Sequence, residues 1–352
     1  MRIDDLDTPA VVIDLDRMEA NLARAQQYAN AHRLALRPHI KTHKIPSLAQ
    51  RQIALGAHGI TCQKLGEAEV MAEAGIEDIL ISFNLLGAAK GERLRALARR
   101  CTLSVVADSV AVAEGLSALF AAMGRRLPVL VECDTGAHRC GVPEPQAAAA
   151  LAEIIARLPG LSFAGLMTYP AHGGVAATAA WLEEAVALCA RRGLEPQVVS
   201  TGGTPDLYRA HEVAAATEHR PGTYIYADRS LLARGYCGLE DCALSVLATV
   251  VSRPAPDRCI LDAGSKALSS DLLGLAGHGL IVEHPECVIH ALSEEHGHVS
   301  IPAGAAGPEV GERVRIIPNH ACVVSNLFDL VHGARGGRIE MAYAVAARGR
   351  MQ

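Results

Sequence analysis

The sequence predicts an α/β fold, in which a (β/α)8 barrel is followed by a second, mostly β domain. Up to about residue 240, short β-branched runs alternate with Ala-, Leu-, Glu- and Arg-rich stretches of helical length, a pattern typical of a parallel sheet. Eight strand candidates occur in this part, the number that closes a barrel. From about residue 243 the strand-like runs are separated by Pro and Gly turns, without long helices. We therefore expect a barrel over residues 10–240 and a β domain over residues 241–352, together with residues 1–9.

The barrel elements follow one another regularly along the chain. The run VVIDLD (11–16) and the helical stretch RMEANLARAQQYANAH come first. Helical stretches such as KLGEAEVMAEAG and QAAAALAEIIARL, apolar at helical spacing, separate most of the later strands. An open doubly wound sheet is the alternative, but no GxGxxG follows the first strand. The eight strand candidates are LALRPHI (34–40), GITCQ (59–63), DILIS (78–82), LSVVAD (103–108), PVLVECD (128–134), LSFAGLMTY (161–169), PQVVSTG (196–202) and the stretch ending in TYIY (223–226).

The second domain is expected to consist of strands joined by turns. Its strand candidates are ALSVLATVVSR, RCILDAG, GLIVE, CVIHALSEEHG, RVRIIPNHACVV and GRIEMAYAVAARG.

Composition and charge argue against a nucleic-acid-binding, secreted or membrane-spanning protein. Half of the 352 residues are apolar, a fifth are charged, and the net charge is -5 without any basic run, which argues against a nucleic-acid partner. MRIDDLDTPA has no signal-peptide pattern, and no apolar run has the length of a membrane span. Ten cysteines without a CxxC pair could form disulfides, but reduced thiols in a cytoplasmic enzyme fit better.

Polar residues gather where the barrel strands are expected to end. A cluster such as RPHIKTHK (37–44) is ordinarily a solvated loop, but active sites of barrels lie at the C-terminal ends of their strands. Lys41 is therefore a candidate Schiff-base lysine, its amine activated by neighbouring cations and partial burial. The polar groups after the other strands are Gln63, Asp134 to Arg139, Tyr169, Ser200 to Thr204 and Gly222 to Tyr224.

Two glycine turns follow the last two strand candidates, STGGTP (200–205) and RPGTY (220–224). Most glycine turns are only turns, but backbone N–H groups at the last strands of a barrel often bind phosphate. Together with Lys41, they indicate a phosphate-bearing aldehyde cofactor, pyridoxal phosphate.

PNHAC (318–322) supplies a further candidate site. If this segment is a strand, His320 and Cys322 project from the same face and could bind Zn²⁺ with positions left open for substrate. The alternative is a core cysteine beside a hydrogen-bonded histidine.

The order of these motifs resembles the D-threonine aldolase and D-serine dehydratase family, with its alanine-racemase-like, type III pyridoxal-phosphate fold. The resemblance runs from LDTPA (6–10) to AARG (346–349). It departs from many of the aldolases in having His-x-Cys instead of His-x-Asp, and YPAHGG instead of YHG, although VVSNLFD is more similar to the aldolases. The motifs that carry it are RPHIKTHK, KLGEAEVMAEAGIEDIL, DTGAHRCGV, STGGTP, RPGTY, DAGSKAL, LSEEHG and PNHAC.

This resemblance implies a homodimeric enzyme and a role for individual residues. Lys41 would bind the cofactor covalently, Arg139 would meet its phenolate side, and His320 and Cys322 would bind a divalent metal, Zn²⁺ or Mn²⁺. His172 and His296 are candidate auxiliary bases, with His172 preferred. The residues expected to contact the ring and phosphate are Tyr169, Ser200, Gly202, Gly203, Thr204, Gly222, Thr223 and Tyr224.

Three functions are compatible with these residues. The first is a pyridoxal-phosphate- and metal-dependent lyase acting on D-3-hydroxy amino acids, by retro-aldol cleavage to glycine and an aldehyde or, alternatively, by dehydration of D-serine or 3-hydroxyaspartate. The second is an amino-acid racemase, which has no use for a metal pair. The third is a non-enzymatic cofactor carrier, which would not need the second domain. We favour the lyase, and among lyases the aldolase.

Overall fold

The chain forms two compact units in the computed structural model, which describes residues 1–352. The first, called the β unit below, comprises Met1–Ala23, Thr42–Ile45 and Thr223–Gly349. The second, called the barrel unit, comprises Arg24–Lys41, Pro46–Gly222 and Arg350–Gln352.

The barrel unit is built on an eight-stranded sheet whose paired strands are all parallel. The strand order is β2-β9-β8-β7-β6-β5-β4-β3. A parallel bridge between His39 and Thr61, and a hydrogen bond of 2.8 Å from Thr61 N to Pro38 O, join the first strand to the last. The predicted (β/α)8 barrel is thus confirmed. Its strands are β2 (Ala35–Leu36), β3 (Ile60–Cys62), β4 (Asp78–Ile81), β5 (Thr102–Ala107), β6 (Leu127–Cys133), β7 (Leu161–Thr168), β8 (Val198–Gly202) and β9 (Glu218–Arg220).

The eighth strand differs from its prediction. It ends at Arg220, and Thr223–Ile225 form the 3-10 turn η4 instead of the end of a strand. Pro221 has no N–H to pair with a neighbouring strand. Beyond it, hydrogen bonds from Tyr226 N and Ala227 N to Thr223 O close the turn.

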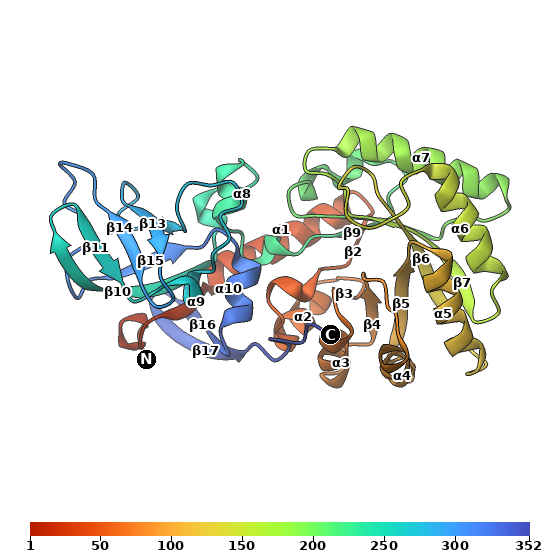
Figure 1. Ribbon diagram of the computed structural model, residues 1–352, viewed down its shortest axis with the longest axis horizontal. Coiled ribbons are helices and arrows are strands. Elements are labelled where there is room, and N and C mark those ends of the chain that lie inside the picture. The colour runs from red at the N-terminus through yellow and green to blue at the C-terminus, as the bar shows by residue number, and fades with distance from the viewer. The chain divides into compact units, whose positions relative to one another are not determined.

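Helices follow one another around this sheet, as Figure 1 shows for α3 to α7. Helix α6 begins with proline at its first turn, where a missing N–H costs nothing. Its alanine-rich buried face packs against β6, β7 and α7. The helices are α1 (Leu15–Ala31), which spans the boundary between the units, α2 (Pro46–Ala54), α3 (Leu65–Glu73), α4 (Ala88–Leu97), α5 (Val110–Ala121), α6 (Pro145–Arg157) and α7 (Val175–Arg191), with the 3-10 turns η2 (Ile40–Thr42) and η3 (Leu207–Glu212).

The β unit contains a nine-stranded, largely antiparallel sheet, which confirms the predicted mostly β second part. Its main path is β13-β14-β11-β10-β1-β16-β17, and β15 pairs with β10 and β12. The strands are β1 (Ala10–Asp14), β10 (Leu244–Ala255), β11 (Arg258–Leu261), β12 (Leu280–Ile281), β13 (Val288–Leu292), β14 (Gly297–Ser300), β15 (Arg313–Ile317), β16 (Leu330–Arg335) and β17 (Arg338–Ala344); the short helices are α8 (Arg229–Ala233), α9 (Ser265–Leu268) and α10 (Ala321–Leu327), with the 3-10 turns η1 (Ile3–Asp5) and η5 (Leu239–Asp241).

The units do not follow the predicted limits of the domains. Strand β1 pairs with β10 and β16, so it belongs to the sheet of the β unit although residues 10–240 were expected in the barrel. Residues Thr42–Ile45 also belong to the β unit. The division into two separately folding domains at residue 240 stays a prediction.

The predicted strand through PNHAC is wrong. Strand β15 ends at Ile317, directly before Pro318, and His320 is the N-cap residue of α10. Cys322 therefore lies in the first turn of a helix.

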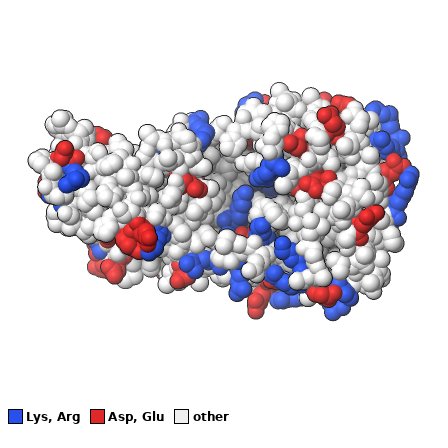
Figure 2. Space-filling view, viewed as in Figure 1, with Lys and Arg blue, Asp and Glu red and all other residues white.

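The surface has mixed charge. Asp and Glu side chains lie among the Lys and Arg side chains on the face in Figure 2, in line with a net charge of -5. None of the helices combines the length and the apolar character that crossing a membrane requires.

Candidate active site

The segment after β2 holds two lysines in different surroundings. Lys44 has a left-handed backbone conformation with a φ of 57°, and its amine donates to Asn326 Oδ1 at 2.8 Å within the β unit. Lys41 belongs to the barrel unit and follows β2, in the turn Ile40–Thr42. Only Lys41 is therefore placed at the strand ends of the barrel.

His39 supports the segment that carries Lys41. Its side chain is buried, its Nε2 lies 3.1 Å from Gln63 Oε1, and its Nδ1 accepts a hydrogen bond from Lys41 N at 3.4 Å. Burial, followed by the charge of Lys41, holds the pKa of His39 well below its ordinary value. A neutral imidazole thus underlies the lysine, and the cluster is not a solvated loop.

Three other predicted site residues surround Tyr169, which directly follows β7. The guanidinium carbon of Arg139 lies 4.7 Å from the centroid of its ring, and the amine nitrogen of Lys41 lies 6.0 Å away. His172 Nε2 lies 3.2 Å from the Tyr169 hydroxyl. Cations over an aromatic face are attracted to it, so the ends of β2, β6 and β7 present two cations and an imidazole around one ring.

The two glycine turns lie side by side in the barrel unit. Gly222 N donates to the Thr204 hydroxyl at 3.3 Å, and Gly203 N donates to Arg220 O at 3.4 Å. Gly203 has a φ of 105°, and a Cβ on Gly202 would approach Arg220 Nη2 to 3.0 Å. Both positions favour glycine because a side chain would be strained or would crowd the arginine. Thr223 and Tyr224 follow in η4 of the β unit.

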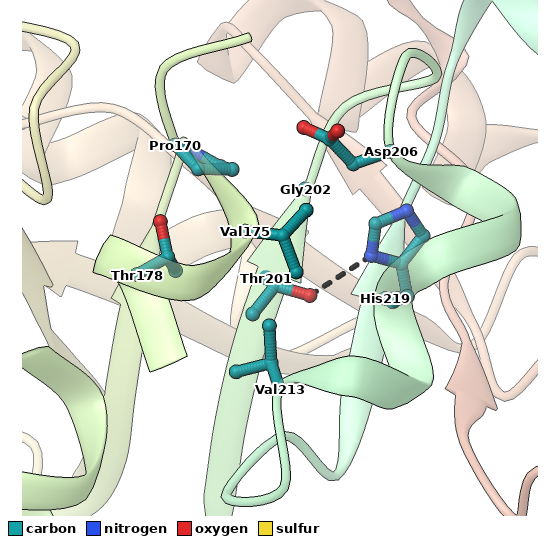
Figure 3. A pocket seen from close by; sticks show the side chains of 9 residues that line it. Pro170, Val175, Thr178, Thr201, Gly202, Asp206, Val213 and His219 are labelled. Atoms are coloured by element: carbon teal, nitrogen blue, oxygen red, sulfur yellow. Dashed lines mark hydrogen bonds between the residues drawn. The ribbon is translucent and has the colours of Figure 1, made fainter. Parts of the chain in front are cut away.

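Hydrogen bonds of the His219 side chain hold the first glycine turn, STGGTP, in place. Figure 3 shows its hydrogen bond with Thr201, 2.9 Å long, beside a cavity of about 10 Å³ that Gly202 and Asp206 also line. Its Nε2 lies 3.1 Å from Gly203 O. Burial, with the charge of Arg220, lowers the pKa of His219 to about 3. The ring is thus neutral, accepting from Thr201 and donating to Gly203.

Three further charged residues, Arg220, Glu218 and Glu132, lie near the same strand ends and were not among the predicted site residues. Arg220 is buried and donates to Ser200 Oγ at 2.5 Å and to Thr168 O at 2.8 Å. Ser200 in turn donates to Glu218 Oε1 at 2.5 Å. Burial lowers the pKa of Arg220 to about 10, so the guanidinium remains charged at neutral pH.

The pattern of the buried strands could have indicated these three residues. Glu218 and Arg220 stand at alternate positions of EHR and so share one face of the sheet, and Glu132 is a lone charge in the apolar run VLVE. Ser200, predicted to contact the cofactor, has its hydroxyl on Arg220 and Glu218.

Glu132 lies on the same face of the sheet, near the end of β6. Its side chain is buried, and burial together with the charge of Asp108 raises its pKa to about 7, although the charges of Arg139 and Arg220 oppose this shift. The carboxyl group therefore titrates near neutral pH beside the two arginines of the site.

The pair His320 and Cys322 is in contact although it does not lie on a strand. The two side chains are hydrogen-bonded to each other, and His320 Nδ1 lies 2.7 Å from Asp271 Oδ2. The hydroxyls of Thr42 and Thr223 lie 3.2 and 3.5 Å from Cys322 Sγ. Asp271 and Thr42 were not among the predicted site residues, whereas Thr223 was predicted as a cofactor contact.

Without a metal, His320 and Cys322 form an imidazolium–thiolate pair, and a metal would take the place of the shared proton. Burial opposes charge on both groups, but their mutual hydrogen bond lowers the pKa of Cys322 and, with Asp271, raises that of His320 to about 9. A thiolate and an imidazole oriented by a carboxylate are the donors that Zn²⁺ prefers. No group of three or more His, Cys, Asp or Glu side chains forms a closed metal site. A metal held by His320 and Cys322 alone would keep its other positions open.

The two candidate bases lie in different units. His172 is exposed in the loop after Tyr169, and Asp206 accepts a hydrogen bond from the next residue, Gly173. His296 is exposed in the turn before β14 of the β unit.

Comparison with known proteins identifies the family. Residues 13–230 match the family described as alanine racemase, N-terminal domain, and residues 243–334 match the putative serine dehydratase domain. A D-threonine aldolase of Arthrobacter sp. is 38% identical over 359 residues, which cover 98% of this chain and 93% of that protein. The chain belongs to the D-threonine aldolase and D-serine dehydratase family. It is a pyridoxal-phosphate-dependent lyase of the alanine-racemase fold.

Other members of this family resemble the whole chain as well. The D-threonine aldolase structure from Filomicrobium marinum has a TM-score of 0.93 and 34% identity, covering 100% of this chain and 98% of that one. A D-threo-3-hydroxyaspartate dehydratase of Delftia sp. is 36% identical, covering 99% of this chain and 96% of the relative. A structure of this dehydratase is that of a cysteine-to-alanine mutant in the metal-free form, with a TM-score of 0.86, 34% identity and 98% of each chain covered.

Proposed function

We propose that the protein cleaves D-3-hydroxy amino acids by a retro-aldol reaction, with D-threonine giving glycine and acetaldehyde. The observation that carries the choice of reaction is the 38% identity, over 98% of the chain, to a D-threonine aldolase. The arrangement of Lys41, Arg139, Tyr169 and His172 at the strand ends supports it, since it offers a nucleophilic amine, an anion-binding cation and a proton acceptor together.

We propose that Lys41 binds pyridoxal phosphate covalently and that the turns at Gly202, Gly203 and Thr204 and at Gly222 to Tyr224 bind its phosphate. When bound, this cofactor supplies an electron sink for negative charge at Cα. Arg139 offers a cation over the Tyr169 ring for the cofactor's phenolate side. Ser200 acts through Arg220, which its hydroxyl and Glu218 hold in place.

A divalent metal, Zn²⁺ or Mn²⁺, is proposed at His320 and Cys322. When bound, it supplies a Lewis acid that makes the substrate hydroxyl more acidic. Asp271 holds the imidazole through Nδ1, and Thr42 and Thr223 hold the thiolate. The metal-free structure of the dehydratase mutant supports this proposal, because it indicates that this relative has a metal-bound form.

His172 is proposed as the base that receives the hydroxyl proton. Its Nε2 is the atom directed at Tyr169, and its exposure leaves the ring open to substrate. Asp206 accepts a hydrogen bond from the adjacent Gly173 N and so holds the loop that carries His172.

We further propose that the enzyme is a cytoplasmic homodimer that takes a free D-amino acid as its substrate. The ten cysteines are all thiols, as expected in a reducing compartment. Light scattering of the purified protein should give twice the chain mass of 37.0 kDa.

Product analysis tests the proposed reaction. The purified protein, loaded with pyridoxal phosphate and Mn²⁺ or Zn²⁺, is incubated with D-threonine, D-serine, D-3-hydroxyaspartate and, as a control of stereochemistry, L-threonine. Glycine and acetaldehyde from D-threonine alone support the proposal. Ammonia and a keto acid from D-serine or D-3-hydroxyaspartate, without aldehyde, would replace it with dehydration. Interconversion of D- and L-isomers without cleavage would place racemisation first.

A further inference from the structure

Two cysteines outside the active site lie in the short connection between α8 and β10. Cys237 and Cys242 are separated by the 3-10 turn η5, in the segment YCGLEDC. Neither cysteine takes part in the proposed cleavage, so a role for this pair is independent of that reaction.

The backbone of this connection brings the two sulfur atoms into contact. Hydrogen bonds from Gly238 N to Asp241 Oδ2 at 2.8 Å and from Cys242 N to Leu239 O at 3.2 Å close the turn. Cys242 Sγ then points back to Gly238 O, 3.8 Å away. The two thiols are hydrogen-bonded to each other and pack in the same apolar cluster.

The two sulfurs differ in their access to solvent. Cys242 is 2% exposed, whereas Cys237 is only partly buried. Other cysteine neighbours in the chain, such as Cys259 and Cys287, are both buried. Cys237 and Cys242 thus differ from that pair in having one partly exposed thiol. A soluble reagent can reach Cys237, which is in direct contact with the buried Cys242.

The surrounding segments hold this turn in place. Ala243 N donates to Tyr226 O at 2.7 Å, and the Arg17 guanidinium donates to Cys242 O at 3.1 Å. The backbone at Cys242 is therefore already held in place before any bond forms between the two sulfurs.

We propose that Cys237 and Cys242 form a thiol–disulfide exchange site, which a small-molecule disulfide such as glutathione disulfide converts reversibly into an intramolecular disulfide. The thiolate of Cys237 attacks one glutathione sulfur, which forms a mixed disulfide and releases one glutathione thiolate. Cys242 then attacks Cys237 Sγ, and the second glutathione leaves with the proton that Cys242 gives up. Two thiols are oxidised to one disulfide, and one glutathione disulfide is reduced to two glutathione thiols.

Peptide mapping of the wild-type protein tests this site. Trypsin cuts after Arg234 and Arg258 but poorly at Arg253, which precedes proline, so one peptide carries Cys237 and Cys242 and no other cysteine. The peptide that starts after Arg139 carries the exposed Cys140 alone and serves as the internal control. Glutathione disulfide is raised until Cys140 is glutathionylated, and the remaining thiols are then alkylated.

The expected result is a peptide 235–258 that takes up neither alkyl group nor glutathione and has lost two hydrogens, while Cys140 carries glutathione. Dithiothreitol should restore both alkylation sites. In Cys242→Ser, Cys237 should keep one glutathione, because no second thiol displaces it. Two alkylated thiols in wild-type peptide 235–258, or a stable glutathione on Cys237 in the wild type, would overturn the proposal.

Discussion

A side chain's chemistry in this protein is set by the groups around it, as the two lysines of KTHK show. Lys41 and Lys44 stand three positions apart, yet Lys44 donates to Asn326 in the β unit, and Lys41 lies over Tyr169 at the strand ends of the barrel. Residue type alone would give both amines the same role. These contacts support the proposal that Lys41, and not Lys44, binds the cofactor.

Reduction with borohydride should therefore attach the cofactor to Lys41 only. Lys41→Ala should abolish the absorbance of covalently bound cofactor and lower the rate by at least about 10²–10⁴-fold, the usual loss for a residue that transfers protons. Lys64→Ala is the matched control, since its amine lies over Phe83 of the same unit at 3.5 Å. Peptide mass mapping identifies the labelled lysine, and a label on Lys44 or Lys64 would refute the assignment.

Glu132 gives the stability of the protein a predictable dependence on pH. Because burial raises its pKa from 4.5 to about 7, the folded state holds this proton more tightly than the unfolded state does. The stabilisation by the protonated form is complete below pH 4.5, is lost as the pH rises towards 7, and amounts to at most about 3 kcal/mol.

Glu132→Gln should remove this dependence, since glutamine resembles the protonated acid. The free energy of unfolding of the cofactor-free protein is measured with urea at pH 5 and pH 8. The difference between variant and wild type should shift in favour of the variant by up to about 3 kcal/mol from pH 5 to pH 8. The exposed Glu114→Gln should change nothing. Equal differences at both pH values would mean that Glu132 titrates normally.

At the scale of elements, the proposed phosphate site depends on the backbone of the turn after β8. His219 binds both Thr201 and Gly203, and the turn after β9 donates to Thr204. The backbone of two strands is thus fixed at the place where we propose phosphate binding. A disturbance of Gly203 should affect the cofactor more than it affects the fold.

Gly203→Ala should lower the affinity for pyridoxal phosphate at least about tenfold and cost about 1–2 kcal/mol of stability, because its φ of 105° is strained for alanine. Gly75→Ala is the matched control, with a φ of 87° and open space around it. It should show a similar loss of stability at an unchanged affinity for the cofactor, measured by equilibrium dialysis. If both variants bind pyridoxal phosphate with equal affinity, the turn at Gly203 does not bind its phosphate.

Elements of the barrel could be predicted where local patterns decide the structure. Seven of the eight strands overlap their predicted ranges, with β5 and β6 each beginning one residue early, because buried parallel strands are continuous apolar runs. The turn at Thr223–Ile225 and helix α10 could not be predicted, since short apolar segments such as TYIY and ACVV fit a strand or a helix equally. Tertiary hydrogen bonds, such as that from Ala321 N to Asp228 Oδ2, decide them.

The candidate site was predictable where a motif carries the chemistry itself. Lys41, Arg139 and His172 could be named because a strand end or a family motif marks them. Strand alternation is the only signal for Arg220, and Asp271 has none, since each contacts a partner far away in the sequence, Ser200 and His320 respectively. Only the folded chain brings these pairs into contact.

At the scale of the whole molecule, the proposed chemistry is divided between the two units. Lys41, Tyr169 and the first glycine turn belong to the barrel unit, whereas His320, Cys322 and Asp271 belong to the β unit. The donors proposed for the metal thus belong to a different unit from the lysine proposed for the cofactor. Removal of the metal should therefore leave the cofactor in place.

Chelation, or Cys322→Ala, should lower cleavage of D-threonine at least about 100-fold while the absorbance of bound cofactor stays unchanged. Asp271→Ala should weaken metal binding by about 10–100-fold, because it frees the imidazole that Asp271 orients. Cys322→Asp should regain activity with Mn²⁺, which prefers oxygen ligands, and Cys140→Ala in the barrel unit is the control. Metal content by elemental analysis, cofactor absorbance and acetaldehyde release are measured on the same samples. Full activity without metal would refute the proposed metal site, and simultaneous loss of cofactor and metal would refute the division of the chemistry between the units.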